Sequence, residues 1–254
     1  MARLKAVSHE DRLSLVEHLD ELRTRIVVSL VVFGVALALC FWQNDQLLKI
    51  ANAPLPDRFT PITLSPTEPF MTTVTVCAYG AIVLSLPIIL YQAYAYVLPA
   101  FSPGERRVVL PLLLLVPFLF AAGVAFGYFV VMPAAVHFLL GFNDSQFNTQ
   151  LRARDYYSFF ATTLLACGIV FQVPVGILAV TRLGVITVDQ LRKNRRYAYL
   201  VCAIVAAALP GVDPVTMLIE MVPLLALYEV SILLARAFGQ PGGGGLHEPS
   251  TQER

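Results

Sequence analysis

The sequence contains few charged residues. Only 14% of its 254 residues are charged, whereas 57% are hydrophobic, and a soluble domain would carry charge on about a quarter of its residues. The net charge is only +1, which gives no bulk attraction to nucleic acid. The charges are clustered, so long uncharged runs separate them. These features predict a membrane protein with no nucleic-acid partner.

Several motifs of metal, redox and nucleotide chemistry are also missing from the sequence. The four cysteines form no CxxC pair and lie inside apolar runs, where cysteine behaves as a small hydrophobe. We therefore expect no metal site and no cofactor. There is no GxxxxGK[ST] phosphate loop and no inverted repeat of the kind common in secondary transporters. Residues 1–25 lack the apolar core of a cleavable signal peptide.

Six apolar segments are candidates for transmembrane helices, since a bilayer core about 30 Å thick needs roughly 20 helical residues. We predict spans at residues 26–44, 70–98, 108–140, 156–181, 197–209 and 215–235. The fifth segment has only about 13 residues and would be roughly 20 Å long. We therefore predict a short crossing hairpin, with a re-entrant hairpin as the alternative.

These spans predict an all-α membrane protein with one six-helix domain at residues 1–239. Short fifth and sixth helices would leave the bundle open, so we expect a concave, glove-like shape. Residues 240–254 follow as a flexible tail, because four consecutive glycines cannot hold a helix.

The distribution of lysine and arginine predicts the orientation. With the N-terminus in the cytoplasm, the cytoplasmic segments hold 14 of the 18 basic residues, which agrees with the positive-inside rule. Both termini would then be cytoplasmic. The two longer outside loops, residues 45–68 and 144–155, are long enough to form a cap. Five prolines between Pro54 and Pro69 predict a stiff, extended first loop.

The segment before the first span has a helical pattern. Leu15, Leu19, Leu22 and Ile26 recur at spacings of four, three and four residues. We expect an amphipathic helix that lies along the cytoplasmic interface and then turns into the first span. Its acidic residues, among them Glu21, form either a solvated face or a recognition surface.

The short loop before the third span has a helix-start pattern. Ser102 can cap the helix, Pro103 suits its first position, and Glu105 completes a capping box. This structural role accounts for Glu105, but its carboxylate would also lie at the cytoplasmic interface and face outward.

Polar side chains inside the later spans form a second group of candidates. Gln172 lies in an otherwise apolar span and needs a hydrogen-bond partner. Asp213 and Glu220 are seven residues apart, so they share a helix face if the helix continues through Pro214. Burying a carboxylate in the bilayer is costly, which makes this pair a candidate proton-sensitive element. Glu229 is expected within reach of Arg236.

Six motifs carry a family resemblance. They are His18–Arg23, Pro66–Phe70, Glu105–Arg107, Phe171–Val175, Arg195–Ala198 and Leu227–Glu229. In this order and spacing they resemble the signature of the TatC family, the multi-spanning receptor of the twin-arginine protein translocase. Each motif also falls at the corresponding place in the predicted topology.

The resemblance implies roles for individual residues. Glu21 and Glu105 would recognise the paired arginines of a signal peptide, since carboxylates bind guanidinium groups bidentately. Arg23 belongs to the same motif as Glu21, and Tyr96 would provide an aromatic group beside the site. Gln172 would line a concave face and meet a partner or a lodged signal peptide, with an internal helix–helix hydrogen bond as the alternative.

The resemblance also implies partners and a location. The family exports folded proteins with the proton-motive force and assembles with single-span TatA/TatB-type subunits. We therefore expect a non-enzymatic, multi-pass protein of a prokaryotic inner membrane, surrounded by lipids and homo-oligomeric within its complex.

Two other classes of function compete with this interpretation. An ion-coupled small-solute transporter could use Gln172, Asp213 and Glu220, but the sequence predicts no broken-helix pair around a midplane site. An intramembrane hydrolase is a weaker alternative, because His137, the only histidine within a span, has no obvious serine or aspartate partner.

Overall fold

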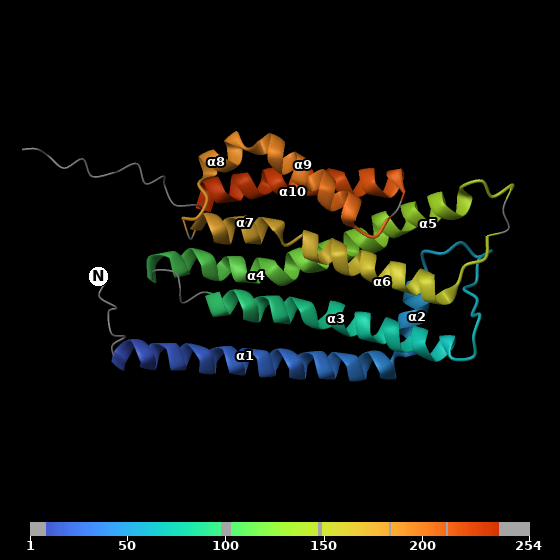
Figure 1. Cartoon of the computed structure of the whole chain (residues 1–254), viewed down its shortest axis with the longest axis horizontal. Coiled ribbons are helices and arrows are strands. Elements are labelled where there is room, and N and C mark those ends of the chain that lie inside the picture. Colours follow the sequence, from blue (N-terminus) through green and yellow to red (C-terminus); the bar gives the residue numbers. More distant parts are fainter. Residues whose placement is uncertain (1–8, 98–102, 147–148, 183, 212, 239–254) are drawn as a thin grey trace, which may run out of the picture.

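The protein is a bundle of roughly parallel and antiparallel helices (Figure 1). The computed structural model describes residues 9–97, 103–146, 149–182, 184–211 and 213–238, without the side chains of 9–17, 97, 103–114 and 237–238. Within these ranges the only β-type pairing is an isolated bridge between Ile62 and Arg152. The prediction of an all-α protein is therefore confirmed for the described chain. The predictions for Ser102 and for the tail at 240–254 lie outside it.

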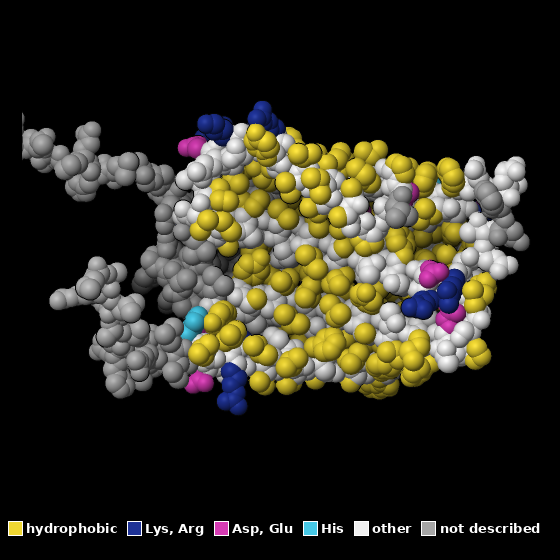
Figure 2. Space-filling model, in the orientation of Figure 1, with side chains coloured by type: hydrophobic (Ala, Val, Ile, Leu, Met, Phe, Trp, Pro, Cys, Tyr) yellow, Lys and Arg dark blue, Asp and Glu magenta, His cyan; other side chains and the backbone are white. Residues whose placement is uncertain are grey.

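Five stretches of the described chain are long and apolar enough to cross a membrane. They are His18–Trp42, Glu68–Tyr96, Leu115–Gly141, Ala153–Arg182 and Pro214–Arg236. In the space-filling view, hydrophobic side chains cover the middle of the bundle and charged side chains gather toward its two ends (Figure 2). This pattern supports a multi-pass membrane protein.

The first helix, α1 (His9–Trp42), is uninterrupted. The predicted turn between an interfacial helix and the first span is therefore wrong. No proline or glycine occurs between His9 and Phe33, so nothing in the sequence breaks the helix there. The charged segment continues straight into the apolar one, and α1 packs along α3 (Glu68–Val97).

The third and fourth predicted spans have irregular centres. The third consists of α4 (Pro103–Phe126), the π-helical turn η2 (Gly127–Val131) and α5 (Met132–Gly141). The fourth is broken at residues 171–172 into α6 (Ala153–Val170) and α7 (Val173–Arg182). Pro174 lacks a backbone N–H, which favours a new helix start over continuation of the old one. The sequence interpretation did not anticipate this break.

The last two helices differ in length. After the short α8 (Val188–Lys193), α9 (Arg195–Ala208) has only 14 residues, as the sequence predicted. By contrast, α10 (Pro214–Phe238) has 25 residues and is roughly 38 Å long. The prediction of a short sixth helix is therefore wrong. Pro223 lies inside α10 without ending it.

Small residues allow α4 and α6 to pack closely. A Cβ atom added at Gly123 would lie 2.6 Å from the Cys167 carbonyl oxygen, and one at Gly168 would lie 2.6 Å from the Phe120 ring. Gly127 is a further close contact with α6. Such glycine-mediated contacts are common between membrane helices, and they hold the centre of the bundle together.

The end of the bundle that holds the first long loop is more ordered than an extended loop. The first loop contains the helix α2 (Asn44–Asn52), so the prediction of an extended loop is wrong for this part. Tyr156 and Tyr128 donate hydrogen bonds to carbonyl oxygens at the end of α2, and Tyr157 donates to Asn52. These contacts fix α2 against α6 and η2.

Candidate functional site

Five side chains form a cluster where the early part of α1 lies beside the end of α3. We call it the Glu21 cluster: His18, Glu21 and Arg25 on α1, with Gln92 and Tyr96 on α3. The His18 and Tyr96 rings stack with centroids 4.3 Å apart. Arg25 donates to Glu21 and, at 2.9 Å, to the Gln92 side-chain oxygen. The cluster brings together two predicted site residues, Glu21 and Tyr96.

The two oxygens of Glu21 have different surroundings. Arg25 donates to Oε1 from both Nε and Nη2. Oε2 accepts no hydrogen bond from the described side chains and lies 3.9 Å from His18 Nδ1. The Glu21 side chain is 36% exposed. One oxygen is therefore held in position by Arg25, while the other accepts no hydrogen bond from a described side chain and belongs to a partly exposed group.

The structure says less about Arg23 and Glu105, the other two predicted signal-site residues. Arg23 is exposed and forms no ion pair with any described residue. Glu105 lies in the first turns of α4, but its side chain falls outside the described part of the structure. Its predicted role beside Glu21 therefore stays a prediction.

An apolar groove begins at the Glu21 cluster. It has a volume of about 560 Å³ and runs between α1 and α3. Arg25, Gln92 and Tyr96 line its polar end, and Ile26, Leu30, Phe33 and Ile89 are among the residues that line the rest. The groove therefore joins a partly exposed carboxylate site to an apolar surface.

Gln172 lies at the break between α6 and α7. Its side chain is buried, and its Nε2 donates to the Val116 carbonyl oxygen on α4 at 3.2 Å. This is the internal helix–helix hydrogen bond that the sequence left open as an alternative. Its Oε1 has no partner among the described residues.

Asp213 and Glu220 are both buried. Asp213 caps α10, because its Oδ1 accepts from the Thr216 backbone N–H at 2.8 Å and its Oδ2 accepts from the Thr216 hydroxyl. The helix begins at Pro214, so it does not continue through this residue from α9. Both Glu220 oxygens lack a described hydrogen-bond partner, which leaves a buried carboxyl group without compensation.

Glu229 does not pair with Arg236, contrary to the expectation. Instead Arg195 donates to Oε2 at 2.7 Å and the Tyr199 hydroxyl donates to Oε1 at 2.6 Å. Both donors come from α9, so this group ties α9 to α10.

A second glutamate–arginine pair lies at the opposite end of the bundle. The Glu68 side chain is 4% exposed, and its Oε1 accepts from Arg152 Nε at 2.8 Å. The Leu64 backbone N–H donates to Oε2 at 2.9 Å. Backbone hydrogen bonds between Ile62 and residues 151 and 153 join the same two loops. The hydrogen bond and the charge of Glu68 raise the pKa of Arg152.

Sequence reasoning missed Arg25 and Gln92. Arg25 follows Glu21 by four residues, a spacing at which helical side chains meet, so local pattern could have found it. Gln92 is an amide in an apolar span, the same signal that singled out Gln172. No cluster of three or more potential metal ligands occurs among the described residues.

Comparison with known proteins shows which family the chain resembles. The family described as "Sec-independent protein translocase protein (TatC)" matches residues 17–223. Proteins of that name from Desulforapulum autotrophicum and Aquifex aeolicus are 34% and 35% identical over 91% and 87% of this chain, and over 87% and 94% of their own lengths. The chloroplastic TATC protein of Arabidopsis thaliana is 36% identical over 89% of this chain and 67% of its own.

A solved structure is also similar. The crystal structure titled as the twin arginine translocase receptor TatC superposes with a TM-score of 0.74 at 34% identity, covering 87% of this chain and 99% of that one. None of these matches is named as a solute transporter or a hydrolase. The extent of the family match and the identity to these relatives show that the chain belongs to the TatC family of Sec-independent protein translocase proteins.

Proposed function

We propose that this protein is the subunit of a twin-arginine translocase that receives signal peptides at the cytoplasmic face. The observation that carries the proposal is the Glu21 cluster, in which Arg25 holds one oxygen of Glu21 while Oε2 accepts no hydrogen bond from a described side chain. The protein carries out no covalent chemistry in this role. It binds a peptide and passes it to other subunits.

The proposed recognition uses the shape of the guanidinium group. An arginine of the signal peptide donates to Glu21 Oε2, and its partner arginine binds Glu105. Lysine is a point charge and cannot reproduce the planar, forked donor arrangement. An exposed ion pair of this kind contributes only about 0.2–1 kcal/mol, so two pairs cannot hold a cargo protein alone.

The apolar groove between α1 and α3 supplies further binding. Its polar end is formed by Arg25, Gln92 and Tyr96, beside the proposed arginine site. The apolar stretch of a signal peptide would lie along Ile26 and Ile89 once its arginines are bound. Arg23, exposed one turn before Ile26, would contact the peptide flank.

The proposed topology has six spans, with α9 as a short fifth crossing and both termini in the cytoplasm of a prokaryotic inner membrane. The bias of basic residues supports this orientation. A helix of 14 residues spans roughly 21 Å, so we propose that the bilayer thins around it. The shortness of α9 supports a concave bundle.

We propose that the same bundle assembles with TatA/TatB-type subunits and with further copies of itself, and uses the proton-motive force. The unpartnered Oε1 of Gln172 offers an acceptor to a partner helix or a lodged signal peptide. The buried carboxyl groups of Asp213 and Glu220 are the proposed proton-sensitive element.

Photocrosslinking of a twin-arginine signal peptide to membranes containing the protein tests the proposal. We expect crosslinks near Glu21 with the wild type, and their loss in Glu21→Ala, in Glu105→Ala and with a twin-lysine peptide. Equal crosslinking of the arginine and lysine peptides to the wild type would refute the receptor function.

A further inference from the structure

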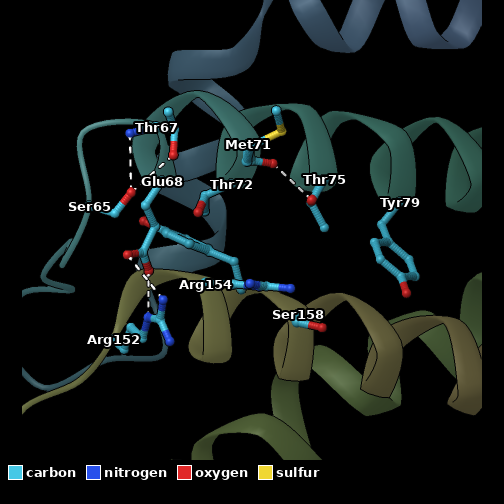
Figure 3. Close-up of a pocket in the computed structure, with 11 residues that line it drawn as sticks. Ser65, Thr67, Glu68, Met71, Thr72, Thr75, Tyr79, Arg152, Arg154 and Ser158 are labelled. Carbon is cyan, nitrogen blue, oxygen red and sulfur yellow. Dashed lines mark hydrogen bonds and ion pairs between the residues drawn. The ribbon is translucent and has the colours of Figure 1, made fainter.

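A polar pocket lies between the first turns of α3 and α6, at the end of the bundle opposite the Glu21 cluster. Its volume is about 400 Å³, within the range of about 300–1,000 Å³ typical of ligand sites. Figure 3 shows its α3 wall with Glu68, Thr72 and Thr75, and its other side with Arg154 and Ser158. The proposed receptor function does not use these residues.

The pocket has an excess positive charge. Its lining includes one carboxylate, Glu68, and two guanidinium groups, Arg152 and Arg154. Arg152 donates to both oxygens of Glu68, and the Leu64 backbone N–H also donates to Oε2. Arg154 forms no ion pair with a described carboxylate and extends between α3 and Ser158 (Figure 3). The unneutralised charge of Arg154 favours an anionic ligand.

A buried hydroxyl group lies at the pocket wall without a partner. The hydroxyls of Thr73 and Thr75 each donate to the carbonyl oxygen four residues earlier. Thr72, directly before Thr73 in the chain, is only 5% exposed, but its Oγ1 has no hydrogen bond among the described residues. An unsatisfied buried hydroxyl is unfavourable, so Thr72 would gain a hydrogen bond from a ligand oxygen.

The position of the pocket identifies the kind of ligand. Two apolar spans begin here, one at Glu68 and one at Ala153, so the pocket lies where the hydrocarbon region meets the polar headgroups. The starts of α3 and α6 add the partial positive charge of two helix dipoles. Met71 lines the pocket and is 57% exposed, which offers an apolar surface to an acyl chain.

We infer that this pocket binds the phosphate group of an anionic glycerophospholipid such as phosphatidylglycerol. Arg154 is the main contact to the phosphate, and Thr72 donates a hydrogen bond to it. The lipid would fill the space between α3 and α6 and brace the start of both helices. Its assignment to the outer leaflet rests on the proposed topology, whereas the binding itself does not.

Native mass spectrometry of the purified chain in detergent tests the inference, with phosphatidylglycerol and the zwitterionic phosphatidylcholine as probes. We expect phosphatidylglycerol to be retained preferentially and Arg154→Gln to weaken its binding by about ten-fold, the loss of one hydrogen bond to a charged group. Thr72→Val should weaken it less. The matched control is Arg58→Gln, an exposed arginine of the first outside loop that pairs with Asp144.

Four outcomes would overturn the inference. They are equal loss of lipid in Arg58→Gln and Arg154→Gln, no preference between the two lipids, displacement of the lipid by equimolar inorganic phosphate, and a photocrosslinker at Ser158 that captures protein instead of lipid. Thermal unfolding of each variant shows whether it is folded. The signal-peptide crosslinks are measured separately. A negative result for the lipid site therefore does not affect the test of the receptor function.

Discussion

Two glutamates at opposite ends of the bundle each pair with an arginine, but the two pairs are built differently. Glu21 and Arg25 are four residues apart on one helix, and the Glu21 side chain is 36% exposed. Glu68 and Arg152 are 84 residues apart, and the Glu68 side chain is 4% exposed. The first pair joins neighbouring turns of α1, and the second joins two loops.

The difference in hydrogen bonding separates their roles. Glu68 has both oxygens occupied, and backbone hydrogen bonds beside it join the same two loops. Glu21 has only Oε1 occupied by hydrogen bonds from described side chains. A carboxylate that is buried and fully bound serves structure. One that is positioned on one oxygen and open on the other can exchange partners, as a receptor requires.

The largest expected effect comes from Glu21→Gln. Because the amide keeps the shape but loses the charge, we expect signal-peptide binding to fall at least about ten-fold, the loss of a charge-assisted hydrogen bond. The thermal unfolding temperature should hardly change, since Arg25 still donates to Gln92. Peptide titration and thermal unfolding of the same sample measure both. The matched control, Asp20→Asn, replaces an exposed neighbour and should bind normally.

The reverse pattern is expected for Glu68→Gln. Loss of the ion pair to Arg152 should lower the unfolding temperature well below that of Glu21→Gln, while folded protein still binds the signal peptide. Asp57→Asn, in the same loop and exposed, serves as the control. If Arg152→Gln and the variant with both substitutions lower the unfolding temperature no more than Glu68→Gln does, the effects arise from one shared interaction. If the Glu68→Gln variant had unchanged stability, the Glu68–Arg152 pair could no longer be distinguished from the Glu21–Arg25 pair by a structural role.

The sequence predicted the parts of this comparison that depend on local pattern. Apolar runs predicted the five long spans, and the short α9 followed from the turn at Pro210. The family resemblance singled out Glu21 and Tyr96 as candidate site residues. The stacking of His18 on Tyr96 and the pairing of Glu68 with Arg152 join residues far apart in the chain, so spacing along one helix could not predict them.

The errors have physical causes as well. The prediction of a turn before the first span was wrong because an amphipathic pattern does not bend a helix that contains no helix-breaking residue. The break at Gln172 was missed although Pro174 signals it. The length of α10 was underestimated because the predicted span ended at Ala235, before the charged Arg236, whereas the helix continues to Phe238.

A smaller effect is expected from Tyr96→Leu, which removes the stack on His18. Aromatic pairs contribute about 0.5–1.5 kcal/mol beyond burial, so binding of the signal peptide should weaken by roughly two- to ten-fold. Tyr96→Phe keeps the ring and should bind like the wild type, whereas Tyr91→Leu tests an exposed aromatic elsewhere on α3. Equal loss in Tyr91→Leu would show that the effect does not belong to the Glu21 cluster. Competition binding with a labelled peptide gives the comparison.

The smallest effect is expected from Glu229→Gln, which tests a third glutamate–arginine pair. Arg195 and Glu229 are 44% and 36% exposed, so the pair resembles Glu21–Arg25 in exposure and Glu68–Arg152 in joining two elements. Exposed pairs contribute about 0.2–1 kcal/mol, and thermal unfolding should therefore change little. A loss of stability as large as that of Glu68→Gln would mean that connecting two elements, and not burial of the carboxylate, determines which pair is structural.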